Sequence, residues 1–251
     1  MNKKILIVFA AISLSVTALA QVQTLQWRIE DMHCDHCAHK VMTALNQAPG
    51  VSDVDINIER RVATLKYDES ITCPDSIKTW LNGTRYVPTA YNANDVILRE
   101  KSYRIDDMHC GNCARRISSA LEQNKAVDSL DFDLEKHVVY VRYDANQTSR
   151  DNIQETLNGL GFTPVTYYTQ DYVAYAYYNI PENAATASTI EEAMDIEGVA
   201  DANVNSKRKA LAVTYVTNDI TPDQLLEALK KRGIDATVPP PHECKEEQKA
   251  Q

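Results

Sequence analysis

Two pairs of cysteines share one spacing in this 251-residue chain. Cys34 and Cys37 form the first Cys-x-x-Cys motif, Cys110 and Cys113 form the second, and Met-His precedes each pair. Two thiolates three positions apart can face one ion, and sulfur ligands favour soft cations such as Cu(I), Hg(II), Zn(II) and Cd(II) over Mg²⁺ or Ca²⁺. Because a closed zinc site normally takes four ligands, two sulfurs fit a cation of low coordination number best. The motifs therefore predict two soft-metal sites.

Each motif lies where a predicted strand meets a predicted helix. In the first copy, a short strand at 25–29 precedes Cys34, and apolar residues at helical spacing follow over 38–47. The free N–H groups and the positive dipole end of a helix favour a thiolate. We therefore expect the pKa of Cys37 and of Cys113 to be lowered.

The elements around the motifs recur along the chain. A shift of 76 residues with no gap places 28–34 on 104–110, and a weaker third copy follows after a further 72 residues. Each copy shows the order strand, helix, strand, strand, helix, strand, which is that of a ferredoxin-like unit. The predicted fold class is α+β, with three tandem ferredoxin-like βαββαβ sandwiches.

The first twenty residues have the pattern of an export signal. Lys3 and Lys4 precede an apolar stretch, and residues 18–20 supply a small-x-small cleavage pattern with no cysteine beside it. We expect an exported, periplasmic protein that is not a lipoprotein and has no membrane span, since no later stretch reaches ~20 apolar residues. The predicted parts are a signal peptide at 1–20, a first domain at 21–92, a second at 96–168, a third without the motif at 171–238, and a flexible tail at 239–251.

Met-x-Cys-x-x-Cys at a strand-to-helix junction resembles the heavy-metal-associated (HMA) domain family, which includes copper chaperones, exported mercury-binding proteins and modules of metal-pumping ATPases. The resemblance implies that each cysteine pair binds one soft ion, with Cu(I) preferred, and passes it on by ligand exchange without chemical catalysis. It also implies a buried methionine under each metal loop and an aromatic side chain near each site. The matching residues are Met32 and Met108, and Tyr86 and Phe162.

The third copy departs from this pattern because it has no cysteine. Without a gap, Glu182 and Ala185 occupy the ligand positions, and a one-residue shortening would place Asn183 and Thr186 there instead. We expect this copy to bind no soft metal and to serve as a spacer, a docking module or a stability partner. The first two copies depart at one position each, with Asp31 and Asp107 where the family usually has glycine.

The chain is acidic, with 26 Lys and Arg against 35 Asp and Glu and a net charge of −9. Nucleic acid and anionic membrane surfaces attract basic faces, so both are excluded as expected partners. The expected partners are the metal ion and a metal transporter or acceptor metalloprotein with a basic patch. Two other functions remain as alternatives, a thiol–disulfide redox protein and a non-metal interaction scaffold.

Other residues have both plain and functional interpretations. His33 and His109 are solvated loop residues or additional ligands, and Cys73 is a structural or free thiol. His242 and Cys244 lie in the charged tail, either as solvated residues or as an auxiliary ligand pair. The basic run at 207–209 is predicted to be a solvated hairpin turn. The segment 167–178 holds six of the thirteen tyrosines, which indicates a buried interface between two sheets or a docking surface.

Overall fold

The structure is a computed structural model that describes residues 22–240. The predicted signal peptide, and the tail residues His242 and Cys244, lie outside the described residues. The chain divides into two compact units, Met1–Asn92 and Ala93–Gln251. The first unit holds one sheet with its helices, here called module one, and the second unit holds modules two and three.

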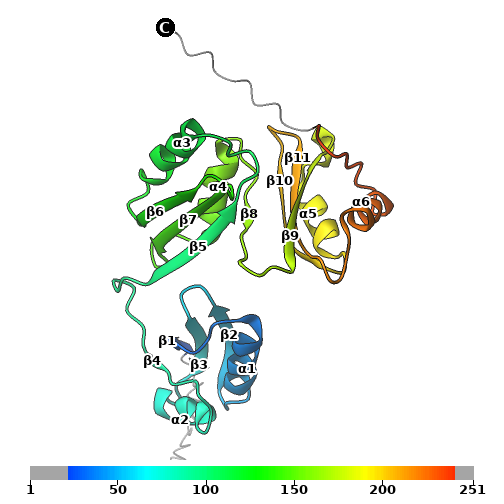
Figure 1. The fold of residues 1–251 in the computed structure, drawn as a ribbon. Coiled ribbons are helices and arrows are strands. Elements are labelled where there is room, and N and C mark those ends of the chain that lie inside the picture. Colours follow the sequence, from blue (N-terminus) through cyan, green and yellow to red (C-terminus); the bar gives the residue numbers. More distant parts are fainter. Residues whose placement is uncertain (1–21, 241–251) are drawn as a thin grey trace, which may run out of the picture. The chain divides into compact units, whose positions relative to one another are not determined.

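Module one is an antiparallel sheet with strand order β2-β3-β1-β4. Its helices share a core with the sheet, since Val41, Leu45 and Ile77 are fully buried in one cluster with Leu65. Figure 1 shows its two helices beside the sheet. The elements are β1 (Val22–Arg28), α1 (Asp35–Asn46), β2 (Val51–Asn57), β3 (Val62–Asp68), α2 (Pro74–Lys78), a 3₁₀ turn (Thr79–Leu81) and β4 (Thr89–Ala90).

Module two repeats this arrangement, with strand order β6-β7-β5-β8. The second strand of both modules carries a bulge at its start, between Val51 and Asp53 in β2 and between Val127 and Ser129 in β6. The bulge breaks the alternation of apolar residues there. The elements are β5 (Leu98–Arg104), α3 (Gly111–Leu121), β6 (Val127–Asp133), β7 (Val138–Asp144), α4 (Arg150–Gly159) and β8 (Val165–Thr166).

Module three follows the predicted order except at its end. Its sheet has three strands in the order β10-β11-β9, and the predicted last strand is reduced to a single bridge between Asn179 and Thr237. The elements are β9 (Val173–Asn179), a 3₁₀ turn (Glu182–Ala184), α5 (Ala187–Met194), β10 (Val199–Asn205), β11 (Ala210–Val216) and α6 (Pro222–Lys231). The fold class is therefore α+β and ferredoxin-like, as the sequence predicts.

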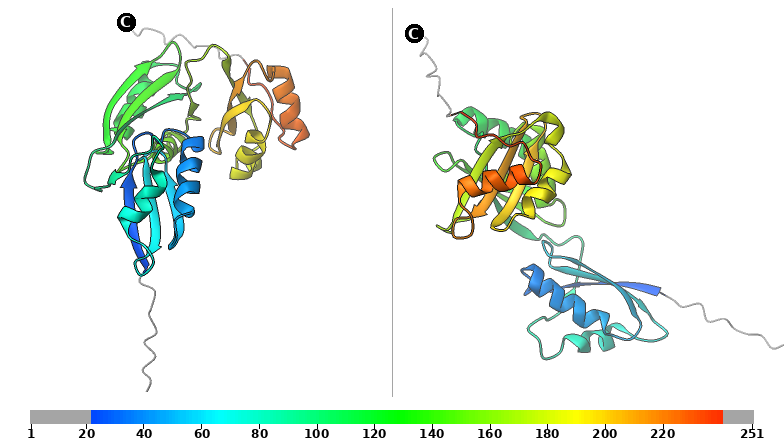
Figure 2. Two further views of the ribbon diagram at one scale, coloured as in Figure 1. Left: turned by 90° about the horizontal axis from the view of Figure 1, so that it is seen from below. Right: turned by 90° about the vertical axis from the view of Figure 1, so that its right-hand side faces the viewer.

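Modules two and three pack together within the second unit. α5 and α6 cover the face of the third sheet that points away from module two, and β8 lies beside the other face (Figures 1 and 2). Every residue of β11 from Ala210 to Tyr215 is consequently buried, on both faces of the strand. The prediction that the tyrosine-rich segment 167–178 buries an interface between two sheets is confirmed, since Tyr167 and Tyr175 stack with ring centroids 5.9 Å apart.

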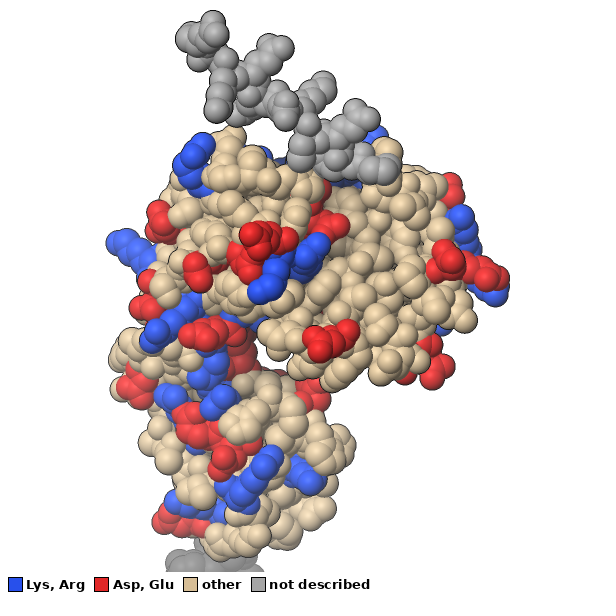
Figure 3. Space-filling view, in the orientation of Figure 1, with Lys and Arg blue, Asp and Glu red and all other residues tan. Residues whose placement is uncertain are grey.

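The surface is mixed in charge on the face that Figure 3 presents, where acidic and basic side chains are interspersed among uncharged residues. Within residues 22–240, no helix has the length and apolar character that a bilayer crossing requires.

Candidate metal-binding sites

The first metal loop is held by backbone bonds to the neighbouring hairpin. Ile29 N–H donates to the Arg61 carbonyl at 2.8 Å, and Met32 N–H donates to the Ile29 carbonyl at 3.1 Å. Both Ile29 and Met32 are fully buried, so the loop is anchored in the core from below. The chain then reaches Cys34, which is the N-cap of α1. The burial of Met32 agrees with the supporting role that the resemblance implies.

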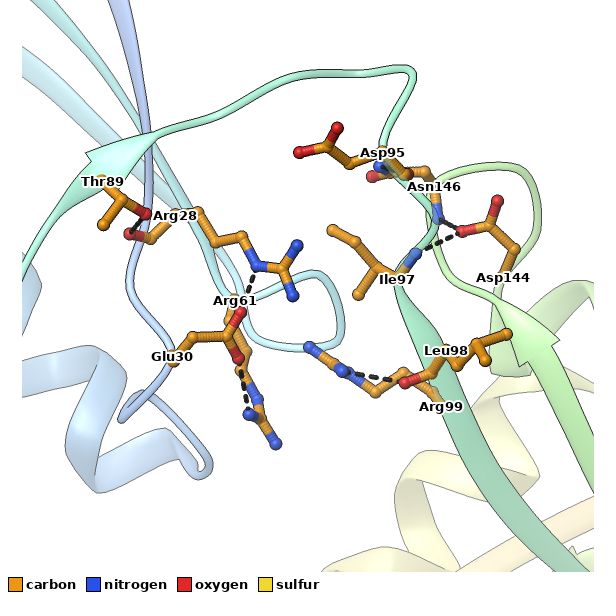
Figure 4. Close-up of polar contacts among 10 residues, drawn as sticks. All are labelled: Arg28, Glu30, Arg61, Thr89, Asp95, Ile97, Leu98, Arg99, Asp144 and Asn146. Carbon is orange, nitrogen blue, oxygen red and sulfur yellow. Dashed lines mark hydrogen bonds and ion pairs between the residues drawn. The ribbon is translucent and has the colours of Figure 1, made fainter.

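Polar side chains brace the same loop from its outer side. Glu30 accepts hydrogen bonds from Arg28 and, at 2.9 Å, from Arg61, the residue that ends the hairpin turn of module one (Figure 4). The two guanidinium groups lower the pKa of Glu30, more than burial raises it. Arg28 at the end of β1 and Arg61 in the hairpin turn thus hold the stretch between β1 and Cys34.

The two sulfurs of site one lie together at the start of α1. Cys34 Sγ and Cys37 Sγ are 2.8 Å apart, well beyond the ~2.05 Å of a disulfide bond. Cys34 also accepts a hydrogen bond from the Cys37 N–H at 3.4 Å, in the manner of an N-cap. Cys34 is exposed, whereas Cys37 is only 4% exposed. One sulfur is therefore enclosed by the fold and the other is accessible from solvent.

The surroundings of Cys37 favour its thiolate form. The hydrogen bond from Cys34 lowers the pKa of Cys37 most strongly, and bonds from the His33 backbone, Tyr86 and Arg85 lower it further. Burial opposes them, and the net result is a pKa of about 6. The Arg85 guanidinium donates to Cys37 Sγ at 3.2 Å. The predicted lowering is confirmed for Cys37.

Site two repeats the loop of site one on α3. Cys110 is the N-cap, its Sγ lies 3.5 Å from Cys113 Sγ, and Met108 is fully buried beneath them. Ile105 N–H donates to the His137 carbonyl at 2.8 Å, as its counterpart does in module one. Cys110 is exposed and Cys113 is half-buried. The pairing of one exposed with one more buried sulfur is therefore common to both sites.

The two sites differ in the residues beside the second cysteine. The 76-residue shift places Gly161 and Phe162 at the positions of Arg85 and Tyr86, so site two has neither the guanidinium nor the phenol. Arg116 of α3 stands over the Phe162 ring, with its Cζ 5.2 Å from the ring centroid. Cys113 Sγ instead lies 3.8 Å from the backbone carbonyl of Asp107.

Asp107 and its counterpart Asp31 also have different surroundings. Asp31 is exposed, and His33 lies 3.9 Å away. Asp107 is half-buried and accepts a bifurcated hydrogen bond from the Tyr177 hydroxyl of module three, which lies 2.8 Å from each carboxylate oxygen. Burial raises the pKa of Asp107, and the bond from Tyr177 opposes that rise. The two loops thus share a backbone and differ in what touches them.

The third module has threonine hydroxyls at the helix start where the first two modules have thiols. The residues at this position differ from those that the sequence predicts. Thr186 is the N-cap of α5, accepts from Thr189 N–H at 3.4 Å, and its Oγ1 lies 3.3 Å from Thr189 Oγ1. The predicted pairs, Glu182 with Ala185 or Asn183 with Thr186, are wrong because α5 has eight residues against twelve in α1. The helix begins about one turn later, after a 3₁₀ turn.

The remaining candidates are not gathered into a metal site. Among residues 22–240, no three His, Cys, Asp or Glu side chains converge to hold an ion. His109 stands edge-on to His137 with ring centroids 5.2 Å apart. Cys73 is exposed, with its Sγ 3.3 Å from the Ser76 hydroxyl.

The basic run at 207–209 is exposed as predicted, but it is more than a solvated turn. Lys207 Nζ donates to the Gly159 carbonyl at 2.7 Å, and Arg208 Nε donates to the Gly161 carbonyl at 2.9 Å. These carbonyls belong to the C-terminal end of α4 and the loop that follows it, where unpaired C=O groups attract cations. The run therefore fastens module three to module two.

Sequence reasoning missed Arg85 and the Tyr177 contact for different reasons. Arg85 is not repeated in the second copy, so the internal repeat gave no signal for it. The contact between Tyr177 and Asp107 joins residues 70 positions apart, which no local pattern indicates. Thr186 belongs to the residue types that begin helices, and this signal is visible in the sequence.

Two stretches of the chain, residues 27–86 and 102–163, match the family model of the heavy-metal-associated domain. Each stretch contains one of the two cysteine pairs and the strand-to-helix junction that carries it. The chain carries two heavy-metal-associated domains. The matched residues lie in modules one and two.

Similar proteins include metal transporters. The copper-exporting P-type ATPase of Bacillus subtilis is 22% identical over 144 residues, which is 57% of this chain and 17% of that protein. The chain thus spans less than a fifth of the length of this relative. The solved N-terminal soluble domains of Bacillus subtilis CopA are 23% identical and cover 61% of this chain and 99% of theirs, with a TM-score of 0.27. The N-terminal domain of the zinc(II) ATPase ZiaA is 28% identical over 28% of this chain and 100% of its own, with a TM-score of 0.27.

Proposed function

We propose that the chain binds up to two Cu(I) ions, one at Cys34 and Cys37 and one at Cys110 and Cys113, and that it works after export. In this proposal it buffers copper or hands it to a transporter or acceptor protein. The observation that carries the proposal is the pairing of sulfurs 2.8 Å and 3.5 Å apart at two helix starts. The heavy-metal-associated domains support a soft metal, and the copper-exporting relative favours copper among the soft metals.

The ligand supply at each site suits a two-coordinate ion. No third acidic, histidine or cysteine side chain converges on either pair among residues 22–240. A closed zinc site would need two more ligands than each loop provides. Cu(I) between two thiolates carries a net charge of −1, and in site one the Arg85 guanidinium, 3.2 Å from Cys37 Sγ, offsets that charge.

Transfer would proceed by exchange of sulfur ligands at the exposed cysteine. An incoming thiolate of a partner bonds to the ion while Cys34 still holds it, and Cys34 then leaves before Cys37, which the fold keeps in place. The oxidation state of the ion does not change, and no covalent bond of the protein breaks. The chain therefore needs no catalytic group for this role.

A competition titration tests the proposal. We expect reduced protein to take two equivalents of Cu(I) from a competing chelator, and the Cys34→Ser/Cys110→Ser variant to take none at the same chelator strength. Cys73→Ser is the matched control and should keep both equivalents, because Cys73 is in neither pair. Micromolar or weaker binding that is unchanged in the double variant would contradict the proposal.

A thiol–disulfide role is the second candidate, because the close sulfurs and the low pKa of Cys37 also suit a redox pair. Rapid reduction of insulin by the reduced protein would favour it. Under the copper proposal, that reduction is no faster than with free dithiol at equal concentration.

A further inference from the structure

Module three has lost the thiols and yet keeps an extensive contact with module two. The sheet face without helices is covered, so Ala212 is 4% exposed and Thr214 is fully buried. Asn203 and Asn205 of β10 are each 3% exposed, although they are polar. A free module would leave such a face in water, as antiparallel sheets commonly do. A linker between the two modules would not by itself bury this face, so the contact between the sheets needs its own explanation.

The polar contacts of module three converge on the two sides of site two. On one side, the Tyr177 hydroxyl makes a bifurcated hydrogen bond to the Asp107 carboxylate, 2.8 Å from each oxygen, and the Thr163 hydroxyl lies 3.4 Å from the same carboxylate. The backbone carbonyl of Asp107 is the group that lies 3.8 Å from Cys113 Sγ. Tyr177 of module three thus holds the side chain of Asp107. The backbone of Asp107 in turn lies beside Cys113, a predicted metal ligand.

On the other side, module three holds the loop that carries the aromatic residue of site two. Asn205 Nδ2 donates to the Phe162 carbonyl at 2.6 Å, and Arg208 Nε donates to the Gly161 carbonyl at 2.9 Å. Phe162 is fully buried. Both the loop before the cysteines and the loop opposite them are therefore fixed by one neighbouring sheet.

Site one shows the same loops without such a neighbour in its own unit. Asp31 has a half-exposed side chain, 53% exposed, with the His33 ring 3.9 Å away. Val87, the counterpart of Thr163, is 63% exposed. The two sites thus differ in the contact with module three, and they differ also at Arg85 and Tyr86, whose counterparts are Gly161 and Phe162.

We propose that module three is a clamp that holds site two in its metal-binding conformation, with Tyr177 as the positioning residue, so that site two releases its ion more slowly than site one. This inference rests on the proposed binding of Cu(I). A loop already fixed in the bound conformation loses less conformational freedom when the ion binds, which strengthens binding. Site one is then the exchanging site and site two the retaining site.

The test compares two tyrosines of β9 in a background that has only site two. Both variants are made in the full chain with Cys34→Ser/Cys37→Ser. Tyr177→Phe removes the hydroxyl that holds Asp107, whereas Tyr175→Phe removes an interface hydroxyl that contacts the backbone of Tyr168 instead. We expect Tyr177→Phe to speed Cu(I) release to excess chelator by roughly threefold to tenfold, and Tyr175→Phe to change it by less than about twofold.

A second readout needs no metal. In metal-free protein with all four motif cysteines, we expect Tyr177→Phe to speed hydrogen exchange of the amides at 105–113 and to leave those at 29–37 unchanged. If site two takes up no Cu(I), the proposed function fails, and the exchange experiment still judges the clamp. Unchanged exchange at 105–113, or equal acceleration of copper release by both tyrosine variants, would overturn the role of Tyr177.

Discussion

The loop opposite the cysteines is open in module one and covered in module two. Val87 is 63% exposed, and its counterpart Thr163 is 1% exposed; Thr89 is exposed, and its counterpart Val165 is 2% exposed. The sheets, helix starts and sulfur pairs repeat between the modules, so the difference comes from the docking of module three. One fold therefore presents the same ligand pair in two different environments.

The end of the second helix explains why the two sites differ in charge, since Gly161 directly follows Leu160, the C-cap of α4. Gly161 adopts a φ of +90°, a conformation that favours glycine, and its carbonyl accepts from Arg208 of module three. An arginine at that position, like Arg85 in module one, would be strained. The docked site thus lacks the cation that offsets a thiolate in the open site, and it gains a fixed loop instead.

The largest expected effect comes from replacing a donor in the interface. Asn205 Nδ2 donates to the carbonyls of Asn158 and Phe162, so Asn205→Asp places a carboxylate against two carbonyl oxygens. We expect the free energy of unfolding of the second unit to fall by about 2–4 kcal/mol. Denaturant unfolding followed by tyrosine fluorescence measures it.

The matched control for that variant is Asn57→Asp, at the same position of module one. Asn57 and Asn205 each accept a backbone N–H of the hairpin turn, and Asp133 shows that aspartate fits this turn in module two. We expect Asn57→Asp to change stability by less than about 0.5 kcal/mol. Equal losses in both variants would show that the turn, and not the docking, is responsible.

The second prediction concerns the pH dependence of site one. The pKa of Cys37 is lowered to about 6, so its thiolate stabilises the folded protein fully above the unfolded pKa of ~8.5, and this contribution is lost as the pH falls through about 6. In Cys110→Ser/Cys113→Ser protein, we expect alkylation of Cys37 to reach half its maximal rate near pH 6.

The sequence of module two supplies the variant that sharpens this prediction. Arg85→Gly/Tyr86→Phe gives site one the residues found at 161–162, and we expect the half-maximal pH of Cys37 alkylation to rise. The bond from Cys34 is the largest cause of the lowered pKa, so the rise is partial. Fragmentation of the alkylated peptide in the mass spectrometer distinguishes Cys37 from Cys34. A profile that does not move in the variant would contradict the assigned roles of Arg85 and Tyr86.

The smallest effect concerns the N-caps of the second helices. Ser149 Oγ accepts from Asn152 N–H at 3.2 Å at the start of α4, whereas its counterpart Cys73 makes no such bond at the start of α2. We expect Cys73→Ser to raise stability by about 0.5–1 kcal/mol and Ser149→Cys to lower it by a similar amount. Thermal melts of both variants check this, and changes of the same sign would contradict it.

Much of this arrangement could be predicted from the sequence because it is local or repeated. The helix starts at Cys34 and Cys110 follow from apolar spacing, and the 76-residue repeat predicts that both loops are alike. The sequence repeat places the start of the first helix of module three too early. The helix α5 is shortened at its start, while the strands around it keep the spacing of the repeat. The clamp was out of reach, because Tyr177 and Asp107 come together only through the packing of two sheets. The division at 21–92, 96–168 and 171–238, the export signal and the four metal ligands remain predictions.

X-ray absorption at the copper edge of Cu(I)-loaded protein tests the central claim most directly. The account predicts two sulfur scatterers for each copper and no nitrogen scatterer, with the same spectrum in Cys110→Ser/Cys113→Ser protein at one equivalent. Nitrogen or oxygen in the first coordination shell, or a sulfur signal that survives replacement of all four motif cysteines, would contradict it.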